Sequence, residues 1–344
     1  MKKLKLVLLS VLVLGLLAGC GKSEKKEAPA EGNKKNQTEA KGEGSTEKIK
    51  VQIANTQGEK DTQSIGMMEV KKELEATGMF DVQLFFSSAL GGTDDVLEQG
   101  LQGVPVVAMS DPGRLASYVK DFGIIQMPYI LENVDDLDKL VETDLYKGWE
   151  KQFEEKGVKI ITANWFNGPR NFVCNNEVNT PADLAGKKIR TIGSDLFVES
   201  INAMGAIATP MEWSEVYPSI QQGALDGAEV QTPSAYPTRL YEICKYVNKT
   251  EHFNLITVPV MGAKVFNSWP KEAQEKFVEV FKKVGTENRK IVDSTIKEYE
   301  EDMAKKGMVI REVDKTPFKQ AVEPVYEKLG YSQLREEFKK AIGE

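Results

Sequence analysis

From Ile49 onward, short strand-like segments alternate with helix-like segments, and this alternation limits the fold to a few layered architectures. Strands are predicted at residues 49–55, 80–86 and 104–109, with helices between residues 61 and 78 and between residues 93 and 103. Asp61 or Thr62 suits the start of the first helix, Thr93 or Asp94 suits the start of the second, and a glycine ends each one. This β-α-β-α-β order favours parallel strands covered by helices.

A second series of the same kind follows the first. Its strands are predicted at residues 159–165, 171–175, 188–192, 228–231 and 253–263, with a helix start at 180–183 and helices at 196–204 and 214–222. The charged stretch 268–306 is helical throughout and, at about 1.5 Å per residue, would exceed about 45 Å, longer than one lobe of a chain this size. We expect either one helix that lies across two lobes, with a kink at Gly285, or two helices. The predicted fold is two α/β units with a ligand site between them.

The charge balance and the reactive side chains exclude several classes of function. The 344 residues include 45 Lys+Arg and 52 Asp+Glu, so no basic excess exists to neutralise nucleic acid phosphates. One histidine and three widely spaced cysteines argue against a His-rich metal site, a Cys-x-x-Cys zinc site and a disulfide framework. The sequence contains no Gly-x-Ser-x-Gly, His-Glu-x-x-His, Walker or strand-anchored Gly-x-Gly-x-x-Gly motif. We therefore expect no enzyme activity, no catalytic residues, no metal, no cofactor and no nucleic acid partner.

The N-terminal residues are typical of an exported lipoprotein. Three lysines within the first five residues precede the apolar run 6–17, which is too short for a bilayer that needs about 20 residues, so residues 1–19 are interpreted as a signal peptide. The run ends in Leu-Ala-Gly-Cys, which resembles the lipobox of bacterial lipoproteins. This predicts that Cys20 carries diacylglycerol and acyl chains such as palmitate, which hold the protein on the extracytoplasmic face of the membrane. The alternative is an ordinary secretory signal with an incidental cysteine.

Residues 20–48 are predicted to be the lipidated cysteine and a flexible tether. After Cys20 this stretch has no aromatic residue and no aliphatic residue larger than alanine, so it cannot offset the entropy of ordering. At about 6 Å times the square root of its length, its typical span is roughly 30 Å.

Several segments together resemble one protein family. They are Ser87-Ser88-Ala89-Leu90-Gly91, Met127-Pro128-Tyr129, Asn167-Gly168-Pro169-Arg170, Ala185-Gly186-Lys187-Lys188-Ile189-Arg190, Thr209-Pro210-Met211-Glu212-Trp213-Ser214-Glu215-Val216-Tyr217 and Gln221-Gln222-Gly223-Ala224-Leu225-Asp226-Gly227-Ala228-Glu229. In combination and spacing they resemble the solute-binding proteins of tripartite ATP-independent periplasmic (TRAP) transporters, of the dicarboxylate-binding type. The resemblance covers nearly all of residues 50–340.

The resemblance implies a two-lobe α/β fold like that of periplasmic binding proteins, with hinge strands and a long helix that spans both lobes. Residues 49–167 would form mainly lobe 1 and residues 168–255 mainly lobe 2. Residues 256–344 would add a hinge return strand, the long helix and C-terminal helices shared between the lobes. The implied function is a receptor that captures a small organic acid, a carboxylate or dicarboxylate, between the lobes and delivers it to TRAP permease subunits. We expect the protein to be a monomer.

The resemblance also implies which residues bind the ligand. The principal ligand-binding arginine of the family matches Arg190, a second carboxylate-facing arginine matches Arg170, and an aromatic or apolar wall residue matches Trp213. A guanidinium offers both oxygens of a carboxylate a planar fork that lysine lacks. Asn167, in the same motif as Arg170, joins the candidates, and Val230 replaces an asparagine that is common in the family, which makes this wall more apolar.

Other interpretations of these residues stay open. Asp111 either holds a ligand hydroxyl, pairs with an arginine, or caps the helix that begins at Pro112. Trp213, beside Pro210 and Met211, is equally compatible with a place in the core. Cys174 and Cys244 are expected to be free buried thiols; the alternative is that they pair in an oxidising compartment.

Two alternatives keep the binding fold but change the membrane partner. The chain could be an ABC-type substrate-binding lipoprotein, or a ligand-sensing lipoprotein presented to a membrane receptor. Both are compatible with a lipid anchor, so the N-terminal residues do not separate them from a TRAP receptor.

Overall fold

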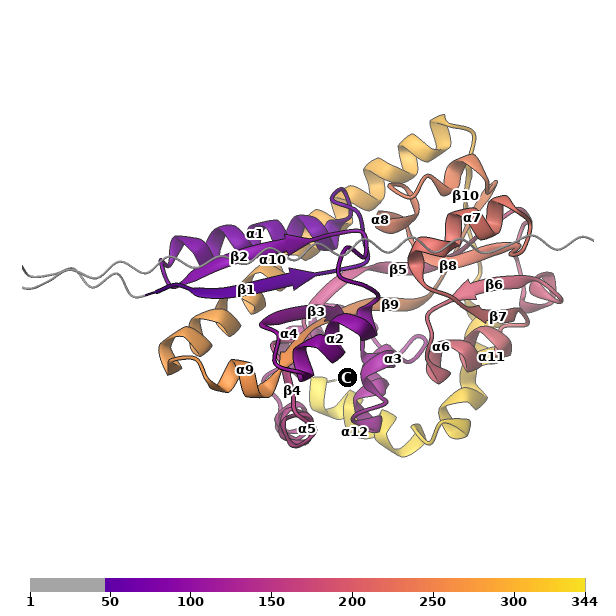
Figure 1. Ribbon diagram of the computed structural model, residues 1–344. Coiled ribbons are helices and arrows are strands. Elements are labelled where there is room, and N and C mark those ends of the chain that lie inside the picture. Colours follow the sequence, from indigo (N-terminus) through magenta and orange to yellow (C-terminus); the bar gives the residue numbers. More distant parts are fainter. Residues whose placement is uncertain (1–46, 344) are drawn as a thin grey trace, which may run out of the picture. The chain divides into compact units, whose positions relative to one another are not determined.

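The computed structural model of the protein describes residues 47–343 (Figure 1). The predictions for the signal peptide, for Cys20 and for nearly all of the tether fall outside these residues. No helix between residues 47 and 343 combines the length and the apolar character that crossing a bilayer requires.

The first lobe is built on three parallel strands, which confirms the sequence prediction. Strand β1 (Ile49–Ala54) pairs in parallel with β2 (Phe80–Phe85) on one side and with β3 (Val106–Ser110) on the other. Helix α1 (Thr62–Ala76) connects the first two strands, and helix α2 (Thr93–Leu101) precedes the third. The α1 helix is capped by Asp61, whose carboxylate accepts a hydrogen bond from the Gln63 amide at 2.8 Å. The α2 helix is capped by Gly92 instead of the predicted Thr93 or Asp94.

The second lobe has a parallel arrangement of its own. Strand β6 (Lys188–Thr191) pairs in parallel with β7 (Ile207–Pro210) and with β8 (Gly227–Gln231), and helix α6 (Asp195–Ala203) follows β6. The helix predicted at 214–222 is instead a 3-10 turn, η3 (Trp213–Glu215), followed by α7 (Val216–Gln221). The helix start predicted at 180–183 is also a single 3-10 turn, η2 (Pro181–Leu184). Two short elements, α8 (Thr232–Ala235) and η4 (Leu240–Glu242), follow β8.

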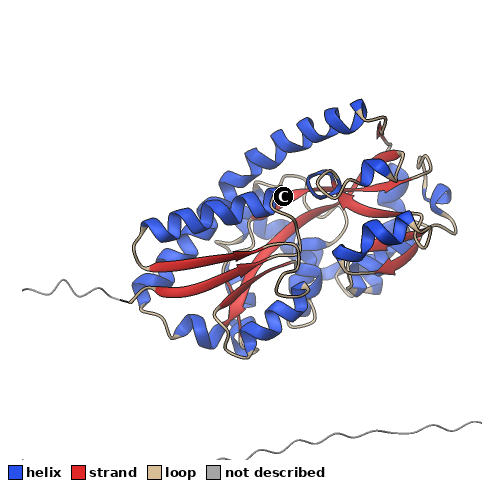
Figure 2. Ribbon diagram, turned by 45° about the horizontal axis from the view of Figure 1, so that its top comes forward, coloured by secondary structure: helices blue, strands red, loops and turns tan. Residues whose placement is uncertain are grey.

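Two long antiparallel strands join the lobes (Figure 2). Strand β9 (Tyr246–Gly262) pairs with β5 (Trp165–Cys174) along much of its length, and its last residues pair with β3 and with β4 (Val158–Ile160). The sheet runs β2-β1-β3-β9-β5-β8-β6-β7, so β9 and β5 lie where one lobe passes into the other. The parallel strand β10 (Val309–Glu312) adds to β9.

Both joining strands are longer than predicted. Strand β5 includes residues 166–170, which were not predicted as strand, and β9 begins at Tyr246 instead of residue 253. The early part of β9 carries Asn248, Thr250 and His252, which look like loop residues in the sequence but are fully buried. Each finds at least one hydrogen-bond partner inside the fold, which reduces the usual cost of placing polar groups there.

The stretch predicted as one or two helices is a single helix, α10 (Lys271–Lys305), about 52 Å long at about 1.5 Å per residue. It packs beside α1 in the first lobe and reaches the second lobe, where Tyr299 stacks on Tyr236 with ring centroids 4.2 Å apart (Figure 1). Gly285 lies inside the continuous helix. A Cβ atom there would come within 2.3 Å of Trp165 Cδ1, so this glycine permits close packing of the helix on β5.

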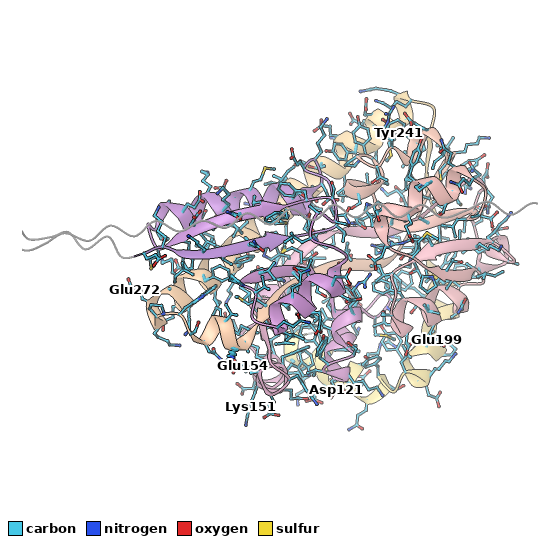
Figure 3. All side chains as sticks on the ribbon, in the orientation of Figure 1. Asp121, Lys151, Glu154, Glu199, Tyr241 and Glu272 are labelled. Carbon is cyan, nitrogen blue, oxygen red and sulfur yellow. The ribbon has the colours of Figure 1, made fainter. Side chains whose placement is uncertain are left out.

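The remaining elements cover the sheet, and charged side chains such as Lys151, Glu154 and Glu272 point outward (Figure 3). They are α3 (Pro112–Leu115), η1 (Lys120–Gln126), α4 (Asp136–Leu140), α5 (Asp144–Glu155), α9 (Ala263–Asn267), α11 (Thr316–Lys328) and α12 (Ser332–Ile342). Cys174 and Cys244 are buried free thiols.

Candidate ligand-binding site

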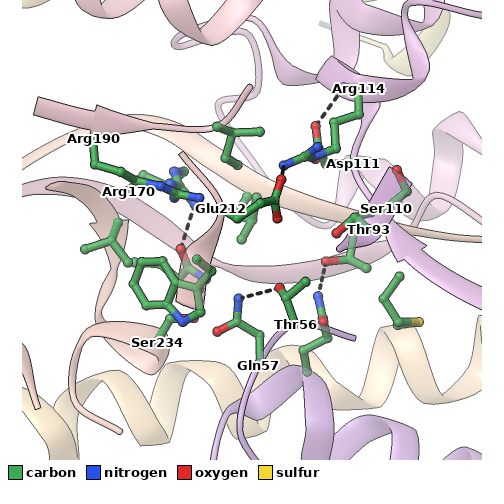
Figure 4. A pocket seen from close by; sticks show the side chains of 18 residues that line it. Thr56, Gln57, Thr93, Ser110, Asp111, Arg114, Arg170, Arg190, Glu212 and Ser234 are labelled. Atoms are coloured by element: carbon green, nitrogen blue, oxygen red, sulfur yellow. Dashed lines mark hydrogen bonds and ion pairs between the residues drawn. The ribbon is translucent and has the colours of Figure 1, made fainter. Parts of the chain in front are cut away.

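A cavity of about 60 Å³ lies between the two lobes (Figure 4). The first lobe contributes mainly polar side chains and Arg114 to its wall. Strands β5 and β9 and the second lobe contribute Arg170, Arg190 and a mixture of apolar and polar groups. The lining residues are Thr56, Gln57, Gln63, Thr93, Met109, Ser110, Asp111, Arg114, Arg170, Arg190, Ile192, Glu212, Trp213, Val230, Gln231, Ser234, Leu255 and Thr257. Five of the six predicted ligand-binding residues are among them.

Arg190 is the buried cation of the cavity that has no acidic partner. It lies on β6 with 4% of its surface exposed, and its Nε and Nη2 atoms donate to the Met211 carbonyl at 2.9 and 2.8 Å. Within residues 47–343, no carboxylate lies within ion-pair distance of its guanidinium, and its Nη1 atom donates no hydrogen bond. Burial, followed by the nearby charges of Arg170 and Arg114, lowers the pKa of Arg190 to about 9, which leaves the group cationic at pH 7.

Arg170 also faces the cavity, but its charge is already neutralised. Its Nε and Nη2 atoms hold the carboxylate of Glu229 on β8, with the Nη2–Oε1 distance at 2.8 Å, and its Nη1 atom donates to Gln231 at 2.8 Å. Arg170 and Glu229 are 2% and 0% exposed. Four of the five guanidinium N–H groups thus bond within the chain, because Nη2 also donates to the Glu229 carbonyl. Arg170 therefore retains one free N–H toward the cavity, and its role as a second carboxylate-facing arginine stays a prediction.

Glu229 and the single histidine complete this buried cluster. The Glu229 carboxylate accepts from the Thr191 hydroxyl at 2.7 Å and lies 3.7 Å from His252 Nε2. Although burial opposes the ionised form, Arg170 and His252 lower the pKa of Glu229 to about 2. Burial lowers the pKa of His252, so the ring is neutral at pH 7 and stacks on Phe172 at 4.5 Å. Through Glu229, this buried cluster holds the Arg170 guanidinium in a fixed position.

Trp213 belongs both to the cavity wall and to the core. It lines the cavity, is 8% exposed, and its ring lies 5.3 Å from the Arg190 guanidinium carbon. It also packs in the apolar cluster of the second lobe with Val216 and Val230. Val230 lines the cavity as well, so this part of the wall is apolar.

The sixth predicted residue, Asn167, does not line the cavity. Its Nδ2 atom donates to the Thr257 hydroxyl, and Thr257 itself is on the wall. Its Oδ1 atom is buried and has no hydrogen-bond partner among the described residues. A direct contact between Asn167 and a ligand stays a prediction.

Asp111 combines two of the three roles that the sequence left as alternatives, the helix cap and the pairing with an arginine, and its contact with a ligand hydroxyl stays a prediction. Its Oδ1 atom caps α3 by accepting from the Arg114 amide at 3.0 Å, and its Oδ2 atom lies 3.4 Å from Arg114 Nε. The side chain is buried and lines the cavity, and this burial raises its pKa in spite of Arg114.

Arg114 is a cation of the cavity wall that the sequence did not indicate as a site residue. It lines the first-lobe side and forms ion pairs with Asp94 at 2.5 Å and, across the lobes, with Glu212 at 3.3 Å. A signal was present in the sequence, because the spacing of Asp111 and Arg114 around a Pro-Gly helix start brings the two side chains together. The ion pair with Glu212 could not be inferred, because it depends on how the lobes meet.

Two α/β lobes that are joined by crossing strands and enclose a charged cavity define a two-lobed solute-binding protein. Comparison with known proteins identifies the family. Residues 53–333 match the family described as bacterial extracellular solute-binding protein, family 7, and the chain belongs to this family of TRAP solute-binding proteins.

Individual relatives agree with this assignment. A solute-binding protein of Chromohalobacter salexigens is 27% identical over 262 residues, which cover 75% of this chain and 77% of the relative. A TRAP periplasmic solute-binding protein from Ochrobacterium anthropi, solved with bound L-fuconate, is 28% identical, with a TM-score of 0.83 over 86% of this chain and 100% of that one. One from Actinobacillus succinogenes, solved with bound L-galactonate, is also 28% identical, with a TM-score of 0.81 over 85% of this chain and 100% of that one.

Proposed function

We propose that the protein is an extracytoplasmic receptor that binds a small organic acid between its lobes and delivers it, chemically unchanged, to a TRAP permease. The observation that carries this proposal is Arg190, a buried guanidinium without an acidic partner on a cavity wall. A buried charge is costly unless it is paired, and a ligand carboxylate would supply the missing partner.

The magnitudes are compatible with transport. One hydrogen bond to a charged group contributes about 1.5–3 kcal/mol, and micromolar affinity requires about 8 kcal/mol. A fork of two such bonds to Arg190 would supply about half of that. The free N–H of Arg170 and the cover of Trp213 over the carbon skeleton would supply part of the rest.

The two similar solved structures hold aldonic acids, which supports an acid as the ligand here. The family assignment supports a TRAP permease over an ABC permease as the partner. Lipidation at Cys20 and attachment to the outer face of the membrane remain part of the proposal on the sequence motif alone.

The proposal is tested by identifying ligands that co-purify with the protein by mass spectrometry and by titrating organic acids, amino acids and neutral sugars calorimetrically. We expect an acid to bind and to be recovered unchanged. Arg190→Ala should weaken its binding at least tenfold, because the carboxylate loses its fork. Arg190→Lys should also weaken binding, since lysine offers a point charge.

Arg239→Lys is a matched control because the Arg239 side chain is 64% exposed and pairs with Glu242 outside the cavity. It should bind like the parent protein. Affinity of Arg190→Ala within twofold of the parent, or preferential binding of a neutral ligand, would contradict the proposal.

A further inference from the structure

The cavity wall opposite Arg190 carries more negative than positive charge. Arg114 is its only cation among the described lining residues. It pairs with Asp111 at 3.4 Å, with Glu212 at 3.3 Å, which comes from the lobe that carries Arg190, and with Asp94 at 2.5 Å, which does not line the cavity. Figure 4 shows Arg114 and Asp111 on one side of the cavity and Arg190 and Arg170 on the other. Three carboxylates therefore surround one guanidinium at this end.

Two buried side chains at this end can bind a hydroxyl group. Asp111 and Ser110 line the cavity with 6% and 3% of their surfaces exposed. Within residues 47–343, the Ser110 hydroxyl has no hydrogen-bond partner. A ligand hydroxyl could donate to the Asp111 carboxylate and accept from Ser110. A ligand carboxylate has no proton to donate to Asp111 and would place a like charge beside it.

The opposite end offers one net positive charge. The carboxylate of Glu229 neutralises Arg170, so Arg190 is the cation that remains without a counter-charge. The cavity is thus charged along its length, with an unneutralised guanidinium at one end and an excess of carboxylates at the other. One ligand carboxylate balances the first end, whereas a second one meets repulsion at the far end.

We propose that the receptor selects ligands with a single carboxylate, held by Arg190, and an uncharged hydroxylated end, held by Ser110 and Asp111. Asp111 is then the specificity-determining residue that rejects dicarboxylates. This inference rests on the proposed function, since it assumes that an organic acid occupies the cavity.

Matched acid pairs test this selectivity in the unmodified protein. Gluconate and glucarate, galactonate and galactarate, and 4-hydroxybutyrate and succinate differ in whether the far end is a hydroxymethyl or a carboxylate group. In calorimetric titrations at pH 8, the best-bound pair should favour its monoacid at least tenfold. Equal or tighter binding of the diacid in that pair would overturn the inference but leave the organic-acid receptor intact. If no acid of any kind binds, the proposed function fails, and this inference fails with it.

Two isosteric variants locate the source of the selectivity. Asp111→Asn removes the buried charge but keeps an N-cap acceptor for α3. It should improve the affinity ratio of diacid to monoacid at least tenfold. Asp94→Asn removes another carboxylate that pairs with Arg114. The Asp94 side chain is 67% exposed, so water screens its charge, and this variant should change the affinity ratio less than threefold. Equal changes in the two variants would refute the role of Asp111.

A third variant, Ser110→Ala, tests the hydroxyl site even if Asp111→Asn does not fold. Ser110→Ala should weaken the hydroxylated monoacid more than its deoxy analogue, 4-hydroxybutyrate compared with butyrate. Equal weakening of both would contradict a hydroxyl site at Ser110.

Discussion

Replacing Glu229 with glutamine should destabilise the protein by about 3–5 kcal/mol at pH 7, although the side chain keeps its shape. The change leaves the Arg170 guanidinium buried without its counter-charge, and removing one partner of a buried ion pair costs about that much. The lowered pKa of Glu229 gives a similar magnitude for this destabilisation. Arg170 and His252 hold the pKa of Glu229 at about 2 against an ordinary value of 4.5, and this difference corresponds to about 3 kcal/mol.

The lowered pKa also predicts in which direction the destabilisation by Glu229→Gln changes with pH. Because the carboxyl pKa is lower in the folded protein than in the unfolded chain, its stabilisation is complete above pH 4.5 and is lost as the pH falls towards 2. About 2 kcal/mol of it should be gone by pH 3. The difference in stability between the parent protein and Glu229→Gln should therefore shrink between pH 5 and pH 3.

Urea denaturation followed by circular dichroism at pH 7, 5 and 3 measures this difference. Glu298→Gln is the control, because Glu298 is exposed on α10, and its free energy of unfolding should stay within about 0.5 kcal/mol of the parent. A destabilisation of Glu229→Gln below 1 kcal/mol at pH 7, or one that stays constant down to pH 3, would refute the reasoning.

Two further predictions concern packing and charge. Gly285→Ala should lower the free energy of unfolding by about 1–3 kcal/mol, because its Cβ would overlap the Trp165 ring, whereas Gly148→Ala in α5 has open space and should raise it by up to about 1 kcal/mol. Urea titrations of both variants test this, and a stabilised Gly285→Ala would contradict the packing argument. Burial raises the pKa of Asp61 to about 6 although Ser234 donates to it, so this carboxylate opposes folding as the pH rises from 3.8 through 6. Asp61→Asn should stabilise the protein by about 1–3 kcal/mol at pH 8 and hardly at all at pH 4, and thermal melts at both pH values would show an equal gain if the reasoning is wrong.

The sequence predicts the first lobe well because its signals are local. Alternating apolar residues, the cap at Asp61 and the glycine ends place β1, α1, β2 and α2 within about two residues. The signal fails in β9, where Asn248, Thr250 and His252 are buried among partners from distant segments. No local pattern distinguishes such residues from a loop.

The candidate site likewise combines residues that local motifs predict with contacts that only the tertiary fold determines. A motif brings Arg190 and Arg170 to the cavity, but the pairing of Arg170 with Glu229 follows from the register of β5 and β8, in which Arg170 lies opposite Gln231. Glu229 is two residues from Gln231 and so lies on the same face of the sheet. Register is a tertiary property, and the neutralisation of Arg170 could not be read from the chain.

The position of Trp213 gives the protein a built-in optical reporter. Of the four tryptophans, all of which lie within residues 47–343, Trp213 is the one on the cavity wall, while Trp149, Trp165 and Trp269 pack in cores of the fold. Its indole also faces the Arg190 guanidinium, whose field would change when an anion arrives. A shift in intrinsic fluorescence on adding an acid would therefore originate at one known place, and a Trp213→Phe variant would identify that emission without any attached dye.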